Sequence, residues 1–163
     1  MCHVSFSIVP QSHSLQDQDS VATMISSPIG SAGGSIHWEE YGVDIEIPPG
    51  AITSDVCRRF HLTCYVPEKA KFQESYIPVG PLFNIGPSCE FQKNISISFK
   101  HWVDHIESTH IELQVLCAPD LEAFSTGRFT ELSHVGFDEE TVTTTCDHFC
   151  FLCPVIRILK RGS

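Results

Sequence analysis

Cysteine and histidine side chains gather near the end of the chain, where thiol and imidazole groups could bind a metal or act as nucleophile and base. Eight consecutive residues contain Cys146, His148, Cys150 and Cys153. On a strand the first three project from one face and Cys153 from the other, because successive side chains alternate. A tetrahedral zinc site would need a fourth ligand, from Cys57 or Cys64, and the Cys150-x-x-Cys153 pair has no second pair beside it. The sequence therefore predicts no metal ion and no cofactor.

Three further histidines lie close together, at positions 101, 105 and 110. On a helix, His101 and His105 would share a face and could form a metal-binding pair. No third ligand follows at helical spacing, and the surrounding residues favour a loop. We therefore expect these to be surface histidines.

The charge balance is acidic, with twenty Asp and Glu residues against ten Lys and Arg, a formal net charge of −10 over 163 residues. This excludes the cationic surface that nucleic-acid binding needs, and an anionic membrane would repel the chain. No apolar run approaches the roughly 20 residues that cross a bilayer, and Met1–Pro10 shows no secretory signal. We therefore expect a cytoplasmic, not a transmembrane, chain whose eight cysteines are reduced and mostly in the core.

Short runs of alternating apolar and polar residues dominate the chain from Ser35 onward. The clearest cover residues 43–47, 95–100 and 111–115, with Pro- and Gly-containing turns between the runs. Helical turns are expected only at Glu68–Phe72 and Trp102–Ser108. The pattern predicts an all-β fold, an antiparallel two-sheet β-sandwich, over residues 31–157, after a disordered N-terminal tail (1–30) and before a short C-terminal tail (158–163).

The same alternation assigns the strand residues to two faces. The expected core residues are Val43, Ile45, Ile47, Ile95, Ile97, Phe99, Ile111, Leu113, Val115, Phe149 and Phe151. The expected exposed residues are Asp44, Glu46, Ser96, Ser98 and Glu112.

One stretch is distinctive: Gly33-Gly34, then Gly42-Val43-Asp44-Ile45-Glu46-Ile47, then Pro48-Pro49-Gly50-Ala51-Ile52. It resembles the opening of the ZU-5 domain, a module of netrin-receptor, zonula-occludens and ankyrin proteins. Pro78–Pro81, Phe91–His101 and the closing Asp147-His148-Phe149-Cys150 are similar to later passages of that family, so the resemblance runs from Gly33 to Ile156. The chain departs from the family pattern at Lys93-Asn94 and at Lys100, where the family commonly has Pro.

The resemblance implies an intracellular protein–protein interaction module of a signalling or scaffold protein. Its partner would be another protein or a companion domain. Because the chain carries a net charge of −10, we expect a basic patch on that partner. No phosphate loop, Gly-x-Ser-x-Gly elbow or paired-carboxylate motif is present, so we expect no enzyme acting on an external substrate.

The resemblance also implies an alternative, because some similar domains cut themselves within a His-Phe-Ser motif. Here the cut would fall between Phe149 and Cys150, with Cys150 as nucleophile and His148 as base. On a regular strand, however, His148 and Cys150 would stand ~6.6 Å apart, beyond hydrogen-bond reach. Asp147 would point to the opposite face and could not orient His148. Self-cleavage would therefore require a bulge or turn at this motif.

Overall fold

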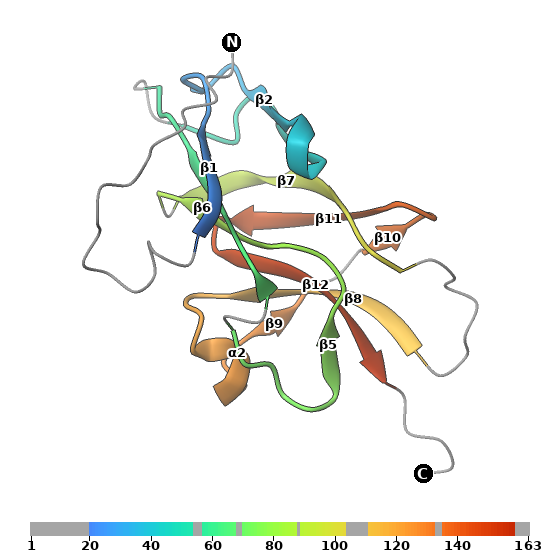
Figure 1. Ribbon diagram of the computed structural model, residues 1–163. Coiled ribbons are helices and arrows are strands. Elements are labelled where there is room, and N and C mark those ends of the chain that lie inside the picture. The colour runs from blue at the N-terminus through green and yellow to red at the C-terminus, as the bar shows by residue number, and fades with distance from the viewer. Residues whose placement is uncertain are drawn as a thin grey trace.

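The computed structural model describes residues 20–53, 57–67, 70–87, 89–103, 111–132 and 135–158. Its strands form two antiparallel sheets packed as a sandwich, which confirms the predicted fold class (Figure 1). The larger sheet, here called the β12 sheet, has the order β1 (Ser20–Ile25), β4 (His61–Tyr65), β6 (Leu82–Gly86), β12 (Phe151–Ile158), β8 (Ile111–Ala118) and β9 (Thr130–Glu131), and β5 (Tyr76–Pro78) pairs with β12. The other, the β7 sheet, has the order β10 (Gly136–Phe137), β11 (Thr141–His148), β7 (Glu90–Lys100), β3 (Val43–Ile47) and β2 (Gly34–Trp38).

The predicted alternation is realised most clearly in β3, whose residues are buried and exposed in turn. Of the expected core residues, ten are buried, and Ile111 is partly buried at the start of β8. Asp44 and Glu46 are exposed as expected, whereas Ser96, Ser98 and Glu112 are half-buried. Neighbouring strands and side chains cover part of these three residues.

Helix is confined to short pieces among the described residues. They are η1 (Glu39–Tyr41), a 3-10 turn between β2 and β3, and α2 (Ala123–Thr126), in the connection from β8 to β9. Pro67 also has 3-10 conformation, and its carbonyl oxygen accepts from Ala70 N–H at 3.0 Å. The expected helical turns do not appear at residues 70–72 or 102–103, and the remainder of those two segments lies outside the described residues.

The domain begins earlier than predicted. Residues 20–25 form β1, which pairs with β4, so the expected tail over residues 1–30 is wrong for its last part. Met24 and Ile29 are buried in the core, although residues 20–30 show no strict alternation of apolar and polar residues. Residues 1–19 and the expected C-terminal tail beyond Ile158 lie outside the described part of the chain.

The buried apolar residues form two hydrophobic clusters. The larger lies between the sheets and includes Ile45, Ile97, Phe83 and Leu152. The smaller, which includes Phe124, Leu116 and Val155, lies under the segment that carries α2. β8 and β12 supply residues to both clusters, which explains why the second half of β8 (115–118) and the first six residues of β12 (151–156) are continuously apolar.

The chain passes from one sheet to the other at Phe149 and Cys150. β11 ends at His148 in the β7 sheet, and β12 begins at Phe151 in the β12 sheet. Figure 1 shows this connection at one end of the sandwich, where the red strands β11 and β12 meet. The crossover, defined as residues 147–150, therefore carries the motif that the sequence singled out.

Candidate functional site

The end of β11 departs from a regular strand. Its pairing with β7 runs in register up to Cys146, which lies opposite Ile95, and then shifts so that His148 lies opposite Glu90. Cys146 is buried, Asp147 and His148 are both exposed, and Phe149 is buried again. The expectation that Cys146, His148 and Cys150 share one face is therefore wrong, because the irregularity changes the phase of the alternation.

This irregularity brings Asp147 and His148 together. His148 Nδ1 lies 2.8 Å from Asp147 Oδ1, which corrects the prediction that Asp147 cannot orient His148. The hydrogen bond from His148 lowers the pKa of the Asp147 carboxyl below its usual value. A carboxylate only accepts hydrogen bonds, so Nδ1 carries the proton, and in the neutral ring Nε2 is left with its lone pair.

The Nε2 atom of His148 faces sulfur. It lies 3.6 Å from Cys117 Sγ, at the end of β8. Cys117 is bonded in a disulfide to Cys150, across a Cα–Cα distance of 6.3 Å. The expectation that all cysteines are reduced is therefore wrong for this pair.

The three residues form one cluster in spite of their separation in sequence. A nitrogen of His148 and the sulfurs of Cys117 and Cys150 all lie within 4.8 Å of one another. The expected separation of ~6.6 Å between His148 and Cys150 is therefore too long. The hydrogen-bond contact of His148 is nevertheless with Cys117 and not with Cys150. The sequence does not indicate Cys117 as a site residue, because only the pairing of β8 with β12 brings it beside the crossover.

Cys146 and Cys153 do not join this cluster. Cys146 lies in the core between the sheets, and burial raises the pKa of its thiol to about 11. Cys153 lies in the smaller hydrophobic cluster. Cys64 is buried in the main core, where burial raises its pKa to about 12, and Cys57 is exposed. The four-ligand zinc site considered from the sequence is thus not assembled.

A pocket of about 630 Å³ opens beside the cluster. Its walls come from the end of β6, the start of β7, the end of β8 and the crossover; they include Asn84, Cys89, Glu90, Cys117, Arg128, His148, Phe149 and Cys150. The candidate nucleophile and base of the sequence motif therefore border one cavity. Cys89, Glu90 and Arg128 were missed because they lie far from the motif in sequence.

The crossover is fixed in place beside this pocket. Phe149 packs edge-on against Phe60 and Phe91, at centroid distances of 5.0 and 4.8 Å, and is only 3% exposed. Its N–H donates to the Cys89 carbonyl oxygen at 3.4 Å, and the Cys150 carbonyl oxygen accepts from Ile85 N–H at 3.2 Å. Contacts on both sides of the Phe149–Cys150 peptide thus hold His148 and Cys150 at the pocket wall.

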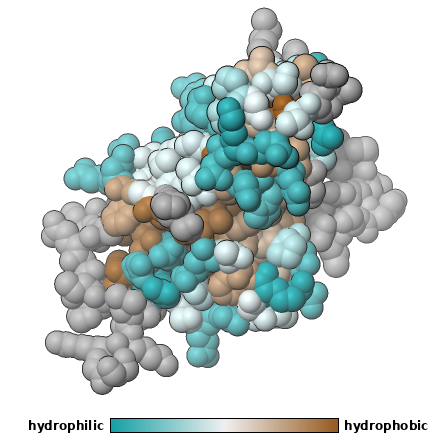
Figure 2. All heavy atoms as spheres, turned by 180° about the vertical axis from the view of Figure 1, so that it is seen from behind, coloured by the Kyte–Doolittle hydropathy of each residue, from teal (hydrophilic) through white to brown (hydrophobic). Residues whose placement is uncertain are grey.

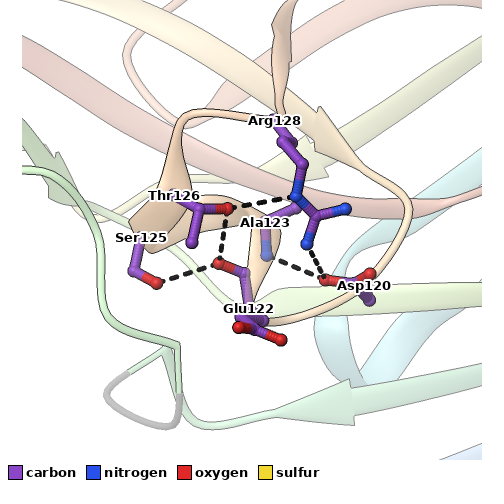
Figure 3. A network of polar contacts seen from close by, with 6 residues as sticks. All are labelled: Asp120, Glu122, Ala123, Ser125, Thr126 and Arg128. Atoms are coloured by element: carbon purple, nitrogen blue, oxygen red, sulfur yellow. Dashed lines mark hydrogen bonds and ion pairs between the residues drawn. The ribbon is translucent and has the colours of Figure 1, made fainter.

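Arg128 is held at the pocket by the connection that follows β8 (Figure 3). Its Nη2 donates to Asp120 Oδ1 at 3.4 Å and its Nε to Thr126 Oγ1 at 3.2 Å. The same Asp120 oxygen accepts from Ala123 N–H at 2.8 Å, and Thr126 Oγ1 donates to the Glu122 carbonyl oxygen at 3.3 Å. This network holds Arg128 at a pocket whose lining also includes Glu90.

Of the three histidines predicted at the surface, the structure describes only His101. His101 is buried, with Nε2 2.8 Å from the Asp138 carbonyl oxygen, and its Nδ1 accepts from Val103 N–H at 3.1 Å. The prediction of a surface residue is wrong for His101, whose ring joins the end of β7 to the β10–β11 turn. His105 and His110 lie outside the described residues.

Comparison with known proteins agrees with this architecture. A family model, ZU5 domain, matches residues 25–118, which is more than half of the chain and includes the Pro48-Pro49-Gly50 corner and Cys117. The crossover lies outside the matched range. No curated protein matches the chain. Within the described ranges, no helix has the length and hydrophobicity to span a membrane. The chain belongs to the ZU5 domain family, and its β-sandwich is a protein-interaction module of that family.

Proposed function

We propose that this protein is an intracellular, cytoplasmic interaction module of a signalling or scaffold assembly, and that it binds a partner through a basic patch on that partner. Two properties support the proposal: membership of the ZU5 family and a formal net charge of −10. The observation that carries it is an exposed tryptophan beside an acidic turn.

Trp102 lies two residues after the end of β7 and is 59% exposed. The backbone N–H of Trp102 donates to the Val79 carbonyl oxygen at 2.7 Å. Val79 follows β5, and Ile77 in that strand is 43% exposed. Figure 2 shows hydrophobic side chains gathered on part of the rear face of the molecule. An exposed tryptophan is typical of the centre of a protein interface, because its large side chain buries much area with few rotatable bonds.

The acidic turn adjoins Trp102 through His101. His101 N–H donates to the Glu140 carbonyl oxygen at 3.0 Å, while its ring contacts the Asp138 carbonyl oxygen. Asp138, Glu139 and Glu140 are all exposed. Carboxylates at the edge of an apolar contact favour a positively charged partner and increase the rate of association.

The test is quantitative capture from a cytoplasmic extract with the protein as bait. Trp102→Ala and the double variant Glu139→Gln/Glu140→Gln are compared with Val66→Ala, a control at a residue that is 40% exposed in a different segment. We expect one set of proteins to be lost with both test variants and retained with the control, and their yield to fall as salt rises. An identical set for all baits, or a yield independent of salt, would contradict the proposed surface.

A second function is favoured by one observation, the alignment of Asp147, His148 and the sulfurs. We propose as the alternative that the protein, once reduced, cuts its own Phe149–Cys150 bond. His148 takes the Cys150 thiol proton, and the thiolate attacks the Phe149 carbonyl carbon. The C–N bond breaks, the Cys150 amine takes the proton, and water then hydrolyses the thioester to leave a Phe149 carboxylate.

Intact mass after treatment with a dithiol reductant tests this alternative. Cleavage yields a fragment ending at Phe149 and a peptide beginning at Cys150. Cys150→Ala and His148→Ala should remain whole, whereas Cys57→Ala, at an exposed thiol, should be cut like the wild type. A single uncut mass for the reduced wild type after prolonged incubation at neutral pH would exclude self-cleavage and leave the interaction module alone.

A further inference from the structure

Soft metal ligands converge at the wall of the pocket. Cys117 comes from β8, and His148 and Cys150 come from the crossover, yet their ligand atoms lie within 4.8 Å of one another. Thiolate and imidazole are the ligands that zinc prefers in proteins. The cluster therefore has the chemistry of a zinc site once its sulfurs are not bonded to each other.

The geometry of His148 is that of a metal ligand. Its Nε2 lies 3.6 Å from Cys117 Sγ. In a tetrahedral zinc site, with Zn–S and Zn–N bonds of about 2.3 and 2.0 Å, sulfur and nitrogen stand about 3.5 Å apart. The nitrogen and this sulfur are therefore already separated as two ligands of one zinc ion would be.

Asp147 supplies the second feature of such a site. A zinc-bound histidine usually donates its other ring N–H to a carboxylate, which fixes the tautomer and turns the free nitrogen toward the metal. Asp147 Oδ1 accepts from His148 Nδ1 at 2.8 Å. This contact involves two exposed side chains and is not needed to fill the core.

The fourth position would face the pocket. Cys89 also lines the pocket, but its thiol contacts the Glu90 carbonyl oxygen at 3.7 Å. Three protein ligands with a fourth position open to a cavity are typical of zinc sites that hold a water molecule or a ligand. Two thiolates also balance the charge of Zn²⁺.

We propose that the reduced protein binds one Zn²⁺ ion through Cys117 Sγ, Cys150 Sγ and His148 Nε2. The disulfide and the zinc-bound form are alternative states of the same site. In the cytoplasmic setting proposed above, disulfides are usually transient and either catalytic or redox-sensing. The zinc site gives the reduced state of this pair a defined structure.

A dithiol can convert the disulfide form into the zinc-binding form with all atoms and electrons accounted for. The dithiol transfers two electrons and two protons to the Cys117–Cys150 bond and becomes a disulfide, leaving two thiols on the protein. Zn²⁺ then displaces two protons and forms two Zn–S bonds. In the reverse direction a disulfide oxidant accepts the two electrons, the S–S bond forms again and Zn²⁺ leaves.

Cobalt(II) titration tests the site, because cobalt replaces zinc and absorbs light when thiolates bind it. The protein is reduced with a phosphine under argon and titrated with cobalt chloride alone, and then with zinc chloride. We expect thiolate-to-cobalt charge-transfer absorption that saturates at one equivalent and is abolished by zinc. The disulfide-bonded protein should give none.

Matched variants separate this site from other thiols. Cys117→Ser, Cys150→Ala and His148→Ala should each remove the saturating signal, whereas Cys57→Ala and His61→Ala, at exposed residues, should keep it. Asp147→Asn leaves all three ligands in place, and its cobalt affinity should fall about 10- to 100-fold. Circular dichroism verifies that each variant is folded. Absence of charge-transfer absorption in the reduced wild type, or an unchanged affinity in both Asp147→Asn and His148→Ala, would overturn the proposal.

Discussion

His148 Nδ1 and Asp147 Oδ1 lie 2.8 Å apart although the two residues are neighbours in one strand. The shift of register after Cys146 makes this possible, because it turns both side chains to the outside. As a consequence, the other ring nitrogen of His148 faces the Cys117–Cys150 disulfide. One local irregularity thus determines the direction of the His148 ring at the crossover.

The crossover should depend strongly on Phe149. Phe149→Ala removes a ring that is 3% exposed and packs against Phe60 and Phe91, so we expect a loss of about 3–5 kcal/mol in the free energy of unfolding. Phe137→Ala, at a phenylalanine that is 49% exposed, should change it by no more than about 0.5 kcal/mol. Urea denaturation followed by tryptophan fluorescence measures both values. Equal losses in the two variants would show that the Phe149 ring is not a core residue.

Gly33 should tolerate no side chain. Its φ is +78°, and an added Cβ would stand 2.4 Å from the Ile47 carbonyl oxygen, at the corner where β3 ends. Gly33→Ala should therefore lower the free energy of unfolding by more than about 1 kcal/mol. Gly136→Ala is the control, since a Cβ there meets nothing within 4 Å. Equal urea midpoints for the two variants would contradict the predicted clash between a side chain at position 33 and the Ile47 carbonyl oxygen.

The thiols should react in an order set by burial. Cys57 is exposed and should be alkylated first by iodoacetamide at mildly alkaline pH. Burial raises the pKa of Cys64 to about 12 and that of Cys146 to about 11, so both should react only when the protein unfolds. Peptide mapping by mass spectrometry gives the order. Labelling of Cys64 or Cys146 in folded protein as fast as Cys57 would disagree with their placement.

The β10–β11 turn should lose stability in acid. Hydrogen bonds from Glu140 N–H, Thr141 N–H and Thr141 Oγ1 lower the pKa of Asp138 in the folded protein. Because the folded-state pKa lies below that of the unfolded chain, about 3.9, the stabilisation is complete above that pH and disappears as the pH falls through the folded-state value.

Melting temperatures measured against pH test this turn. Asp138→Asn should melt below the wild type at neutral pH, and the difference should shrink as the pH falls below about 4. Glu139→Gln removes the same charge from the same turn and serves as the control. A difference between Asp138→Asn and wild type that is independent of pH would refute the role of the carboxylate.

The sandwich could be predicted because its signals are local. In β3, the residues Val43 to Ile47 alternate strictly, and the adjoining Pro and Gly residues end the strand. The sequence does not predict β1, because its residues are covered only when the strand pairs with β4. Ile29, which follows β1, is likewise paired with the distant Arg58. A strand whose partners are remote in sequence needs no strict alternation of its own.

The candidate site could be predicted only in part. The His148-Phe149-Cys150 motif is visible in the sequence, but Cys117 becomes its neighbour only through the pairing of β8 with β12. The expected distance between His148 and Cys150 assumed a straight strand, and the shift of register invalidates it. A shift of register depends on which strand is the partner, here β7. The residues around the motif carry no information about that partner.

The convergence of Cys117, His148 and Cys150 on one site is tested most directly by native mass spectrometry. The protein is measured with one equivalent of zinc, first in its disulfide-bonded form and then after reduction with a phosphine. We predict no bound zinc in the disulfide form. The reduced form should carry one zinc ion, with the loss of two protons, and His148→Ala should not. A reduced wild type without zinc, or equal zinc binding by the disulfide-bonded protein, would contradict the account.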